Sequence, residues 1–210
     1  MLDISSGGGV SRPHRRTALI ALELDSFNVD IAALQETRIA GEGSLTEVGG
    51  GYTFFWKGHP EGHPRVHGVG LAIRTKFMSK ITEAPTYISE RLMTLRVPLV
   101  KGEHVIILSY YAPTLVSDEA TKDDFYAQLD SALSFVKRQD KILLLGDLNA
   151  RVGTNAAVWE GVTGGNGVGN MNSNGLRLLT LCSEHGLTIT NTVFRMRNCL
   201  NPFLPTVAFS

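Results

Sequence analysis

The sequence predicts an α/β (α+β) sandwich in which two packed, mixed β-sheets are flanked by helices. Three observations lead to this fold class: apolar runs too short for helices, segments with helical spacing that alternate with them, and two runs joined by a tight turn. The turn indicates antiparallel pairing, so the sheets are not purely parallel. With 210 residues, the chain is long enough to bury about 70% of its unfolded surface without a metal or disulfide staple.

The first ordered elements are expected to follow a flexible tail over residues 1–14, which contains Ser and Gly clusters and has no periodicity. Apolar side chains then recur at helical spacing and predict a helix over 15–28. The apolar run 30–34 is too short for a helix and predicts a buried strand that ends in Gln35 and Glu36. We therefore place the start of the folded domain at residue 15.

Four further strands are expected in the middle of the chain, at 52–56, 69–74, 92–97 and 105–111. In 92–97, apolar and polar residues alternate, which is typical of a half-buried strand. Lys101-Gly102 lies between the last two runs and predicts a tight hairpin turn that makes them antiparallel neighbours.

Helix and strand alternate again in the last third of the chain. Thr121 and Asp124 resemble a capping box at the start of a helical face over 125–136. The elements expected after it are a strand over 142–145, a glycine-rich loop over 161–175, a helix over 176–185 that ends at Gly186, and a strand over 187–194. Residues 195–210 show neither the helical period of 3.6 residues nor the strand period of 2, which indicates an atypical tail. The domain is therefore expected to span 15–194.

Composition and charge disfavour several classes of protein. Lys+Arg and Asp+Glu both number 20, and this zero net charge disfavours a module that holds nucleic acid by charge alone. Cys182 and Cys199 have no metal-ligand spacing, which disfavours a zinc site or a disulfide scaffold. No apolar run reaches the ~18 residues of a membrane span, and residues 1–10 do not resemble a secretory signal. We expect an intracellular protein, nuclear or cytoplasmic, that is not secreted and has no membrane partner.

Carboxylate and amide side chains follow two of the predicted buried strands. Glu36 follows 30–34, and Asp147 and Asn149 follow 142–145. A rigid strand that ends in a carboxylate provides the oxygen ligand that Mg²⁺ prefers, beside waters and substrate phosphate. Either position alone is explained equally well as a turn or helix-capping residue, so the hypothesis of a metal site depends on the two together with a third element.

The third element is the predicted strand that ends in Tyr111. Four segments then occur in order: ALQETR at 33–38, GVGLAI at 68–73, YAP at 111–113 and LGDLNARVG at 145–153. Together they resemble the endonuclease/exonuclease/phosphatase superfamily, and more closely the craniofacial development protein 2-like proteins and the endonuclease domains of non-LTR retrotransposons. The resemblance covers the predicted domain, residues 15–194.

The resemblance implies a four-layer α/β sandwich that cleaves phosphodiesters with Mg²⁺, with Mn²⁺ as an alternative ion. Nucleic acid, and DNA in particular, is the implied substrate. Glu36 would be a metal ligand, and Asp147 would contribute to the metal site and orient or deprotonate the attacking water. Asn149 would hold a phosphate oxygen, with Tyr111 alongside.

Two motifs of that superfamily are missing from the sequence. The resemblance implies a first strand with an Asn at the metal site, which would precede residue 15, and a closing Ser-Asp-His motif. Neither is found, so we expect a domain that is truncated at both ends and impaired in catalysis, because loss of a positioned acid–base group costs ~10²–10⁴ in rate.

The histidines in the sequence give no clear replacement for that motif. His59, His63 and His67 cluster in a Pro/Gly-rich loop, where such clusters are more often solvated than catalytic, and His185 lies in the predicted helix 176–185. The alternative to an impaired enzyme is a non-catalytic remnant or an interaction protein derived from a retrotransposon-type endonuclease.

Overall fold

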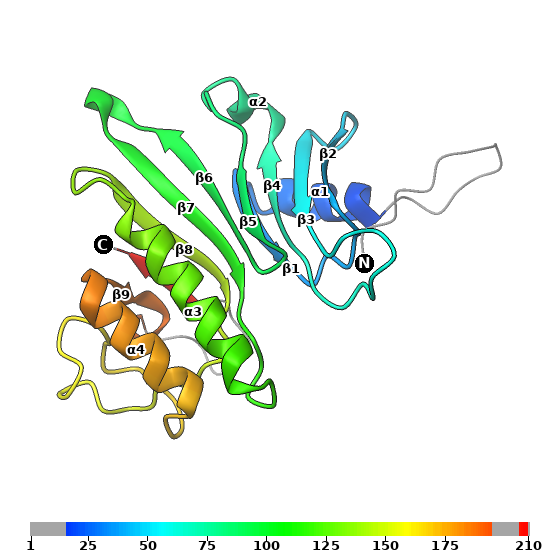
Figure 1. Cartoon of the computed structure of the whole chain (residues 1–210). Helices are drawn as coiled ribbons and strands as arrows, with labels where there is room; N and C mark the ends of the chain where they lie inside the picture. Colours follow the sequence, from blue (N-terminus) through cyan, green and yellow to red (C-terminus); the bar gives the residue numbers. More distant parts are fainter. Residues whose placement is uncertain (1–15, 195–205, 210) are drawn as a thin grey trace.

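The computed structural model describes residues 16–194 and 206–209, which form a sandwich of two β-sheets (Figure 1). The first sheet has four strands in the order β1-β4-β3-β2 and is antiparallel throughout. Its strands are β1 (Ile31–Gln35), β2 (Glu42–Glu47), β3 (Tyr52–Lys57) and β4 (Val69–Arg74). The strands expected at 30–34, 52–56 and 69–74 are thus present, whereas β2 was not predicted because Glu42–Glu47 contains a single large apolar residue, Leu45.

The second sheet has six strands in the order β5-β6-β7-β8-β10-β9. The strands are β5 (Thr86–Ser89), β6 (Leu92–Pro98), β7 (His104–Tyr111), β8 (Lys141–Asp147), β9 (Thr188–Ile189) and β10 (Thr206–Phe209). The neighbours β7 and β8 are parallel, and the remaining pairs are antiparallel. The predicted hairpin between β6 and β7 is confirmed, and its turn includes the 3₁₀ helix η1 (Val100–Gly102).

Helices cover the outer faces of both sheets, so the molecule has four layers. Figure 1 shows α1 (Arg16–Ser26) behind the four-stranded sheet, and α3 (Glu119–Ser134) with α4 (Ser173–His185) on the outer face of the six-stranded sheet. A short helix, α2 (Thr75–Met78), follows β4. The α/β sandwich expected from the sequence is therefore confirmed.

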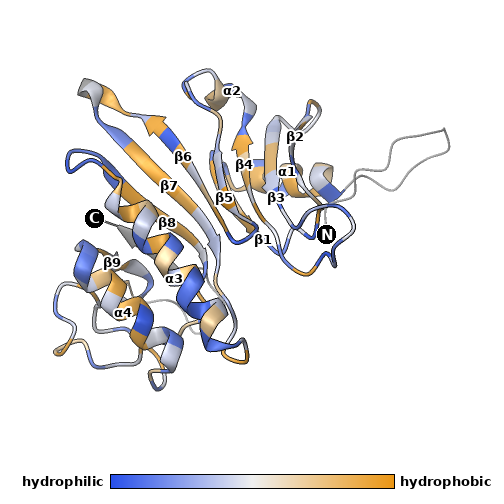
Figure 2. Ribbon diagram, in the orientation of Figure 1, coloured by the Kyte–Doolittle hydropathy of each residue, from blue (hydrophilic) through white to orange (hydrophobic). Residues whose placement is uncertain are grey.

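The central core lies between the two sheets. Because side chains alternate across a strand, Val69, Leu71 and Ile73 of β4 face the six-stranded sheet, whereas Ala72 packs towards α1. The residues that meet β4 from the other sheet are Met93, Leu95, Val97, Ile107 and Tyr111. Figure 2 shows this apolar character along the strands.

Several element boundaries differ from the prediction. The helix expected over 176–185 begins earlier, at Ser173, inside the loop expected over 161–175. The N-cap of α3 is Asp118 rather than Thr121, because the Asp118 carboxylate accepts hydrogen bonds from the backbone N–H and the hydroxyl of Thr121, both 2.8 Å long. The strand expected over 187–194 was too long. It ends after two residues in β9, since the 3₁₀ helix η2 (Thr190–Thr192) turns the chain away.

The structure describes part of the C-terminal segment but not the N-terminal tail. Residues 1–14, predicted as a tail, lie outside the described residues, as do 195–205. No regular structure was expected after 194, yet 206–209 form β10, which pairs with β8 and β9. A strand of four residues inserted between two others is stabilised by pairing on both edges, which a search for periodicity does not detect.

In the described part of the chain, no helix is both long enough and apolar enough to cross a lipid bilayer.

Replacing a core side chain of β7 tests the packing between the six-stranded sheet and its helices. Leu108 is fully buried there, so Leu108→Ala should lower the free energy of unfolding by about 2–5 kcal/mol, measured by urea denaturation. Val116→Ala is the matched control, because Val116 is exposed, and its change should stay within about 0.5 kcal/mol. Equal losses in the two variants would contradict this description of the core.

Candidate active site

Three strands bring the predicted site residues to one edge of the sandwich. In the parallel pair β7–β8, Tyr111 is in register with Asp147, so both strands end at the same edge. Glu36 follows β1 of the other sheet, and the Tyr111 hydroxyl donates a 2.7 Å hydrogen bond to its Oε1. The structure thus brings together Glu36 and Tyr111, which are 75 positions apart in the sequence.

The Glu36 carboxylate has a donor on each oxygen. Tyr111 donates to Oε1, and Arg38 donates to Oε2 at 2.9 Å. The hydrogen bond from Tyr111 lowers the pKa of Glu36 most, and Arg38 lowers it further against the opposing effect of burial. The charged form is therefore favoured, as a metal ligand requires. The ion pair with Arg38 is exposed on both sides and is easily displaced by a stronger cation.

Tyr111 is a hydrogen-bond donor rather than a base. Burial first, and then its hydrogen bond to Glu36, raise the pKa of Tyr111 to about 12. The phenol therefore keeps its proton near neutral pH. Its ring also belongs to the core between the two sheets, which holds the hydroxyl in place.

A set of hydrogen bonds orders the turn after β8. The backbone N–H of Asn149 donates to Asp147 Oδ1 at 2.8 Å, and the Asn149 Nδ2 donates to the Ala112 carbonyl at 2.9 Å. The Ala112 N–H in turn donates to the Asp147 carbonyl at 2.9 Å. The segments that follow β7 and β8 therefore support one another, and Asn149 Oδ1 has no partner among the described residues.

The backbone is strained at two of the predicted site residues. Glu36 has a φ of 50° and Asn149 a φ of 47°, values in the left-handed region that non-glycine residues seldom adopt. Arg38 also has a positive φ, 54°. Such strain persists only where the surroundings impose it, and it is concentrated at functional sites.

Gly146 is required by the close approach of β7 and β8. A Cβ atom on Gly146, which has a φ of 153°, would lie 2.1 Å from the carbonyl oxygen of Tyr110. Any side chain there would push the two strands apart just before Tyr111 and Asp147. The glycine therefore preserves the register on which the site depends.

Asn174 was missed by the sequence analysis. It is buried in the first turn of α4, and its Nδ2 donates to the carbonyls of Pro113 and Asn149 at 3.0 and 3.1 Å. It joins the turns after β7 and β8 from behind. An asparagine near the start of a helix is usually interpreted as a capping residue, so the sequence did not indicate that Asn174 joins these two turns.

The loop histidines are divided between solvent and the site. His63 is exposed, as expected, but His67 is half-buried and its ring centroid lies 6.0 Å from that of Tyr111. The ring of His59 lies 5.6 Å from that of His67. His185 lies in α4, as predicted, and its Nε2 is 2.7 Å from Asp130 Oδ1.

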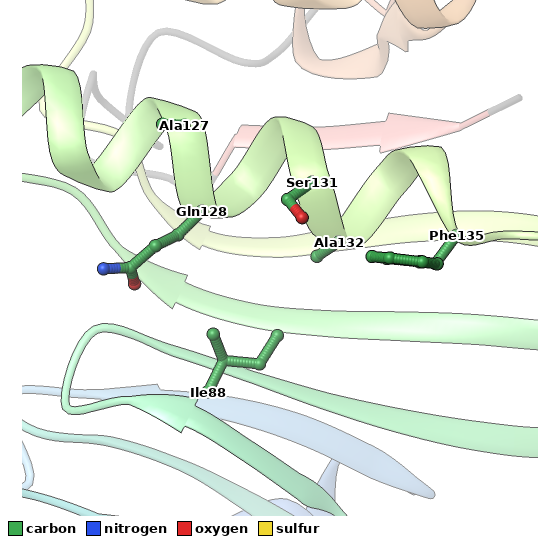
Figure 3. A pocket seen from close by; sticks show the side chains of 6 residues that line it. All are labelled: Ile88, Ala127, Gln128, Ser131, Ala132 and Phe135. Carbon is green, nitrogen blue, oxygen red and sulfur yellow. The ribbon is translucent and has the colours of Figure 1, made fainter.

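An apolar hollow on the surface lies apart from the site residues. Figure 3 shows this cavity of about 490 Å³, which lies between β5 and α3 and is lined by Ile88, Ala127, Gln128, Ser131, Ala132 and Phe135. It contains no titratable side chain. The cluster of Glu36, Tyr111 and Asp147 instead lies at the edge where β1, β7 and β8 end.

The donors of the cluster fit a divalent ion. Among residues 16–194 and 206–209, no three His, Cys, Asp or Glu side chains form a metal-binding group. Mg²⁺, however, commonly takes one or two protein carboxylates and completes its shell with water and substrate phosphate. Glu36 and Asp147 provide two carboxylates, and Asn149 Oδ1 provides a neutral oxygen.

The fold and the matched segments together define a family. A family model described as the Endonuclease/Exonuclease/phosphatase family matches residues 5–179. This chain belongs to that family, and the resemblance inferred from the sequence is confirmed.

Two curated relatives are similar over most of this chain. Craniofacial development protein 2 of Bos taurus is 28% identical over 177 residues, which cover 84% of this chain and 28% of that protein. The protein of the same name from Tragulus javanicus is also 28% identical over 177 residues, covering 84% of this chain and 29% of its own length. The chain thus spans less than a third of the length of these relatives.

Solved structures share the fold. The AP endonuclease LMAP from Leishmania major has a TM-score of 0.60 at 12% identity, covering 93% of this chain and 74% of that chain. The 3′ phosphatase NExo from Neisseria, solved with a product DNA hairpin, has a TM-score of 0.52 at 17% identity. The match covers 93% of this chain and 82% of that chain. At these identities the likeness concerns the fold alone.

Removing the Tyr111 hydroxyl tests the contact that joins the two sheets at the site. In Tyr111→Phe the Glu36 carboxylate loses its strongest donor, so the pKa of Glu36 should rise towards its ordinary value. Carboxyl ¹³C chemical shifts followed against pH report this directly. Tyr87→Phe is the matched control, because Tyr87 lies in β5 and its hydroxyl donates to the Gly43 carbonyl rather than to Glu36. An unchanged Glu36 titration in Tyr111→Phe would disprove the contact.

Proposed function

We propose that this chain is a metal-dependent phosphodiester hydrolase of the endonuclease type that acts on DNA. One observation carries the proposal: Glu36, Tyr111 and Asp147 meet at the edge where β1, β7 and β8 end. Family membership adds support, as do the structures of similar fold, which include an AP endonuclease and a 3′ phosphatase bound to product DNA.

Mg²⁺, or Mn²⁺ in its place, would be held by Glu36 and Asp147 and would supply charge stabilisation for the phosphate in the transition state. The Glu36 carboxylate, on a backbone with a φ of 50°, would be one of the two groups that hold this ion. The ion pair between Arg38 and Glu36 is exposed, so its loss to a bound cation would cost little.

Asp147 positions the attacking water. Its Oδ1 already accepts the Asn149 N–H, which sets the orientation of the carboxylate and leaves Oδ2 to accept a proton from water. Asn149 has a second N–H on Nδ2 beyond the one given to Ala112, and this donor would hold a phosphate oxygen. Tyr111 keeps its proton and holds Glu36 in position.

We also propose that turnover by this chain alone is slow. Within the described residues, the histidine that contacts the site is His67, which lies against Tyr111 rather than against Asp147. No imidazole is therefore assigned to protonate the leaving group, and this step would fall to water.

Nicking of supercoiled plasmid in Mg²⁺ tests the proposed function. The wild-type chain should nick, and Glu36→Gln and Asp147→Asn should each lower the rate by about 10²-fold or more, since each removes a charge that acts in the transition state. Both substitutions preserve side-chain volume and so preserve packing.

Glu103→Gln is the matched control for that assay. Glu103 is an exposed carboxylate in the turn between β6 and β7, at the end of β7 opposite Tyr111. Its variant should nick like the wild type. A folded chain that does not nick would refute the proposed activity, and the role of the domain would then be in binding.

Metal binding is testable without any substrate. Millimolar Mg²⁺ should raise the thermal midpoint of the wild-type chain, because the ion binds only the folded site. The shift should be much smaller in Glu36→Gln, which loses one of two carboxylates, and should persist in Glu103→Gln. A midpoint that is insensitive to Mg²⁺ and to Mn²⁺ would show that the two carboxylates do not form a metal site.

A further inference from the structure

Asn174 is a buried side chain behind the site that the proposed chemistry does not use. It lies in the first turn of α4, and only 1% of its surface is exposed. Its Nδ2 donates to two backbone carbonyls, that of Pro113 at 3.0 Å and that of Asn149 at 3.1 Å. One amide group therefore bonds to both of the segments that follow β7 and β8.

The acceptor side of this amide gains no contact. The Oδ1 of Asn174 is buried and has no hydrogen-bond partner among the described residues. Burying an unpaired acceptor is unfavourable, so the amide carries a cost in stability at this atom. The benefit of an asparagine at this position therefore lies in its two donors and in the carbonyl groups that they hold.

Three different groups of Asn149 are bonded. Its N–H donates to Asp147 Oδ1 at 2.8 Å, its Nδ2 donates to the Ala112 carbonyl at 2.9 Å, and its own carbonyl accepts from Asn174. The first two bonds join the turns after β7 and β8 to one another, whereas Asn174 anchors them from a separate element. The φ of 47° at Asn149 persists only where the surroundings impose it, and Asn174 fixes the carbonyl end of that residue.

The first turn of α4 is a firm support for this anchor. Asn172, its N-cap, accepts the Arg151 N–H at 3.1 Å and donates its own N–H to the Arg151 carbonyl at 3.0 Å. The Tyr126 hydroxyl of α3 donates to the Asn174 carbonyl at 3.2 Å. A Cβ atom on Gly175 would lie 1.8 Å from the Arg151 carbonyl oxygen, so the helix and the turn are in direct backbone contact.

We propose that Asn174 is a positioning residue for the hydrolysis proposed above, on which this inference rests. Asn174 fixes the carbonyl of Asn149, and the N–H of Asn149 in turn fixes Asp147 Oδ1. Asn174 thereby sets the orientation of the carboxylate that positions the attacking water, and that of the Asn149 side chain beside it. Because Asn174 is buried, it acts through these two residues and not on the substrate.

Asn174→Leu tests this role in plasmid nicking, because leucine has a similar volume and no donor. At a temperature where circular dichroism shows a folded chain, kcat should fall about tenfold or more, since a small misplacement of a catalytic group slows the chemical step strongly. KM should change less, because a buried residue makes no contact with the substrate. Asn174→Ser keeps one donor and should have an intermediate kcat, and it serves as the test if Asn174→Leu does not fold.

Leu108→Ala is the matched control for the nicking assay. It also removes a buried side chain and lowers stability, but Leu108 packs in the core with α3 and α4 and makes none of the bonds that hold Asn149. At a temperature where it is folded, its kcat should stay close to that of the wild type. A loss of kcat that only follows stability would appear in both variants.

Amide hydrogen exchange tests the same contact without substrate or metal. In Asn174→Leu, the Asn149 N–H should exchange about tenfold faster than in the wild type, because fewer bonds hold the turn. The NMR cross-peaks of this N–H and of the Asn149 Nδ2 should also shift. The Thr121 N–H is the internal control, since it too donates to an aspartate side chain, that of Asp118, and its exchange rate should not change.

The thermal shift with Mg²⁺ is a third measurement that needs no cleavage. If Asn174 orients Asp147, Mg²⁺ should raise the thermal midpoint of Asn174→Leu by less than that of the wild type. The rise should be unchanged in Leu108→Ala. This measurement reports on the carboxylate itself, whereas hydrogen exchange reports on the turn that carries it.

The outcomes distinguish the positioning role from the proposed hydrolysis. A folded Asn174→Leu or Asn174→Ser chain with wild-type exchange at Asn149 would overturn the positioning role. Faster exchange with kcat and the Mg²⁺ shift both unchanged would also overturn it and leave a purely structural residue. Faster exchange with a smaller Mg²⁺ shift would support it even if the wild-type chain does not nick plasmid, a result that refutes only the cleavage. A wild-type chain with neither nicking nor a Mg²⁺ shift would overturn both proposals.

Discussion

The parallel pairing of β7 and β8 is the constraint on which the remainder of the site depends. Parallel strands end at a common edge, and the register that places Tyr111 opposite Asp147 aligns the two turns that follow. Gly146 allows this pairing, because a side chain there would meet the backbone of β7. The hydrogen bonds of Asn149 and Asn174 then join the two turns.

The site also depends on contact between the sheets. Glu36 belongs to the four-stranded sheet and Asp147 to the six-stranded sheet, and Tyr111 joins them by packing in the core and bonding to Glu36. Positive φ angles at Glu36 and Asn149 show that each side chain is held by its surroundings rather than by local preference. Rigid elements and strained turns together hold these side chains in place, as the proposed hydrolysis would require.

The sequence predicted the strands with strong apolar patterns, such as β4 and β8. Burial on one face produces alternating apolar residues, and burial on both faces produces a continuous apolar run. It did not predict β2, and it gave no indication of β10, since these strands are defined by their neighbours rather than by their own composition. The positions of Glu36, Tyr111 and Asp147 were predicted by motif, but the bond between Glu36 and Tyr111 depends on the packing of two sheets.

A site shared by two sheets is mechanically sensitive to how those sheets sit on one another. A slip of the interface by a fraction of a residue would separate Glu36 from the Tyr111 hydroxyl while every backbone ladder stayed intact. Loosening of the inter-sheet core should therefore abolish function at temperatures where secondary structure is still complete. The site would be lost because one sheet slides on the other, before either sheet unfolds.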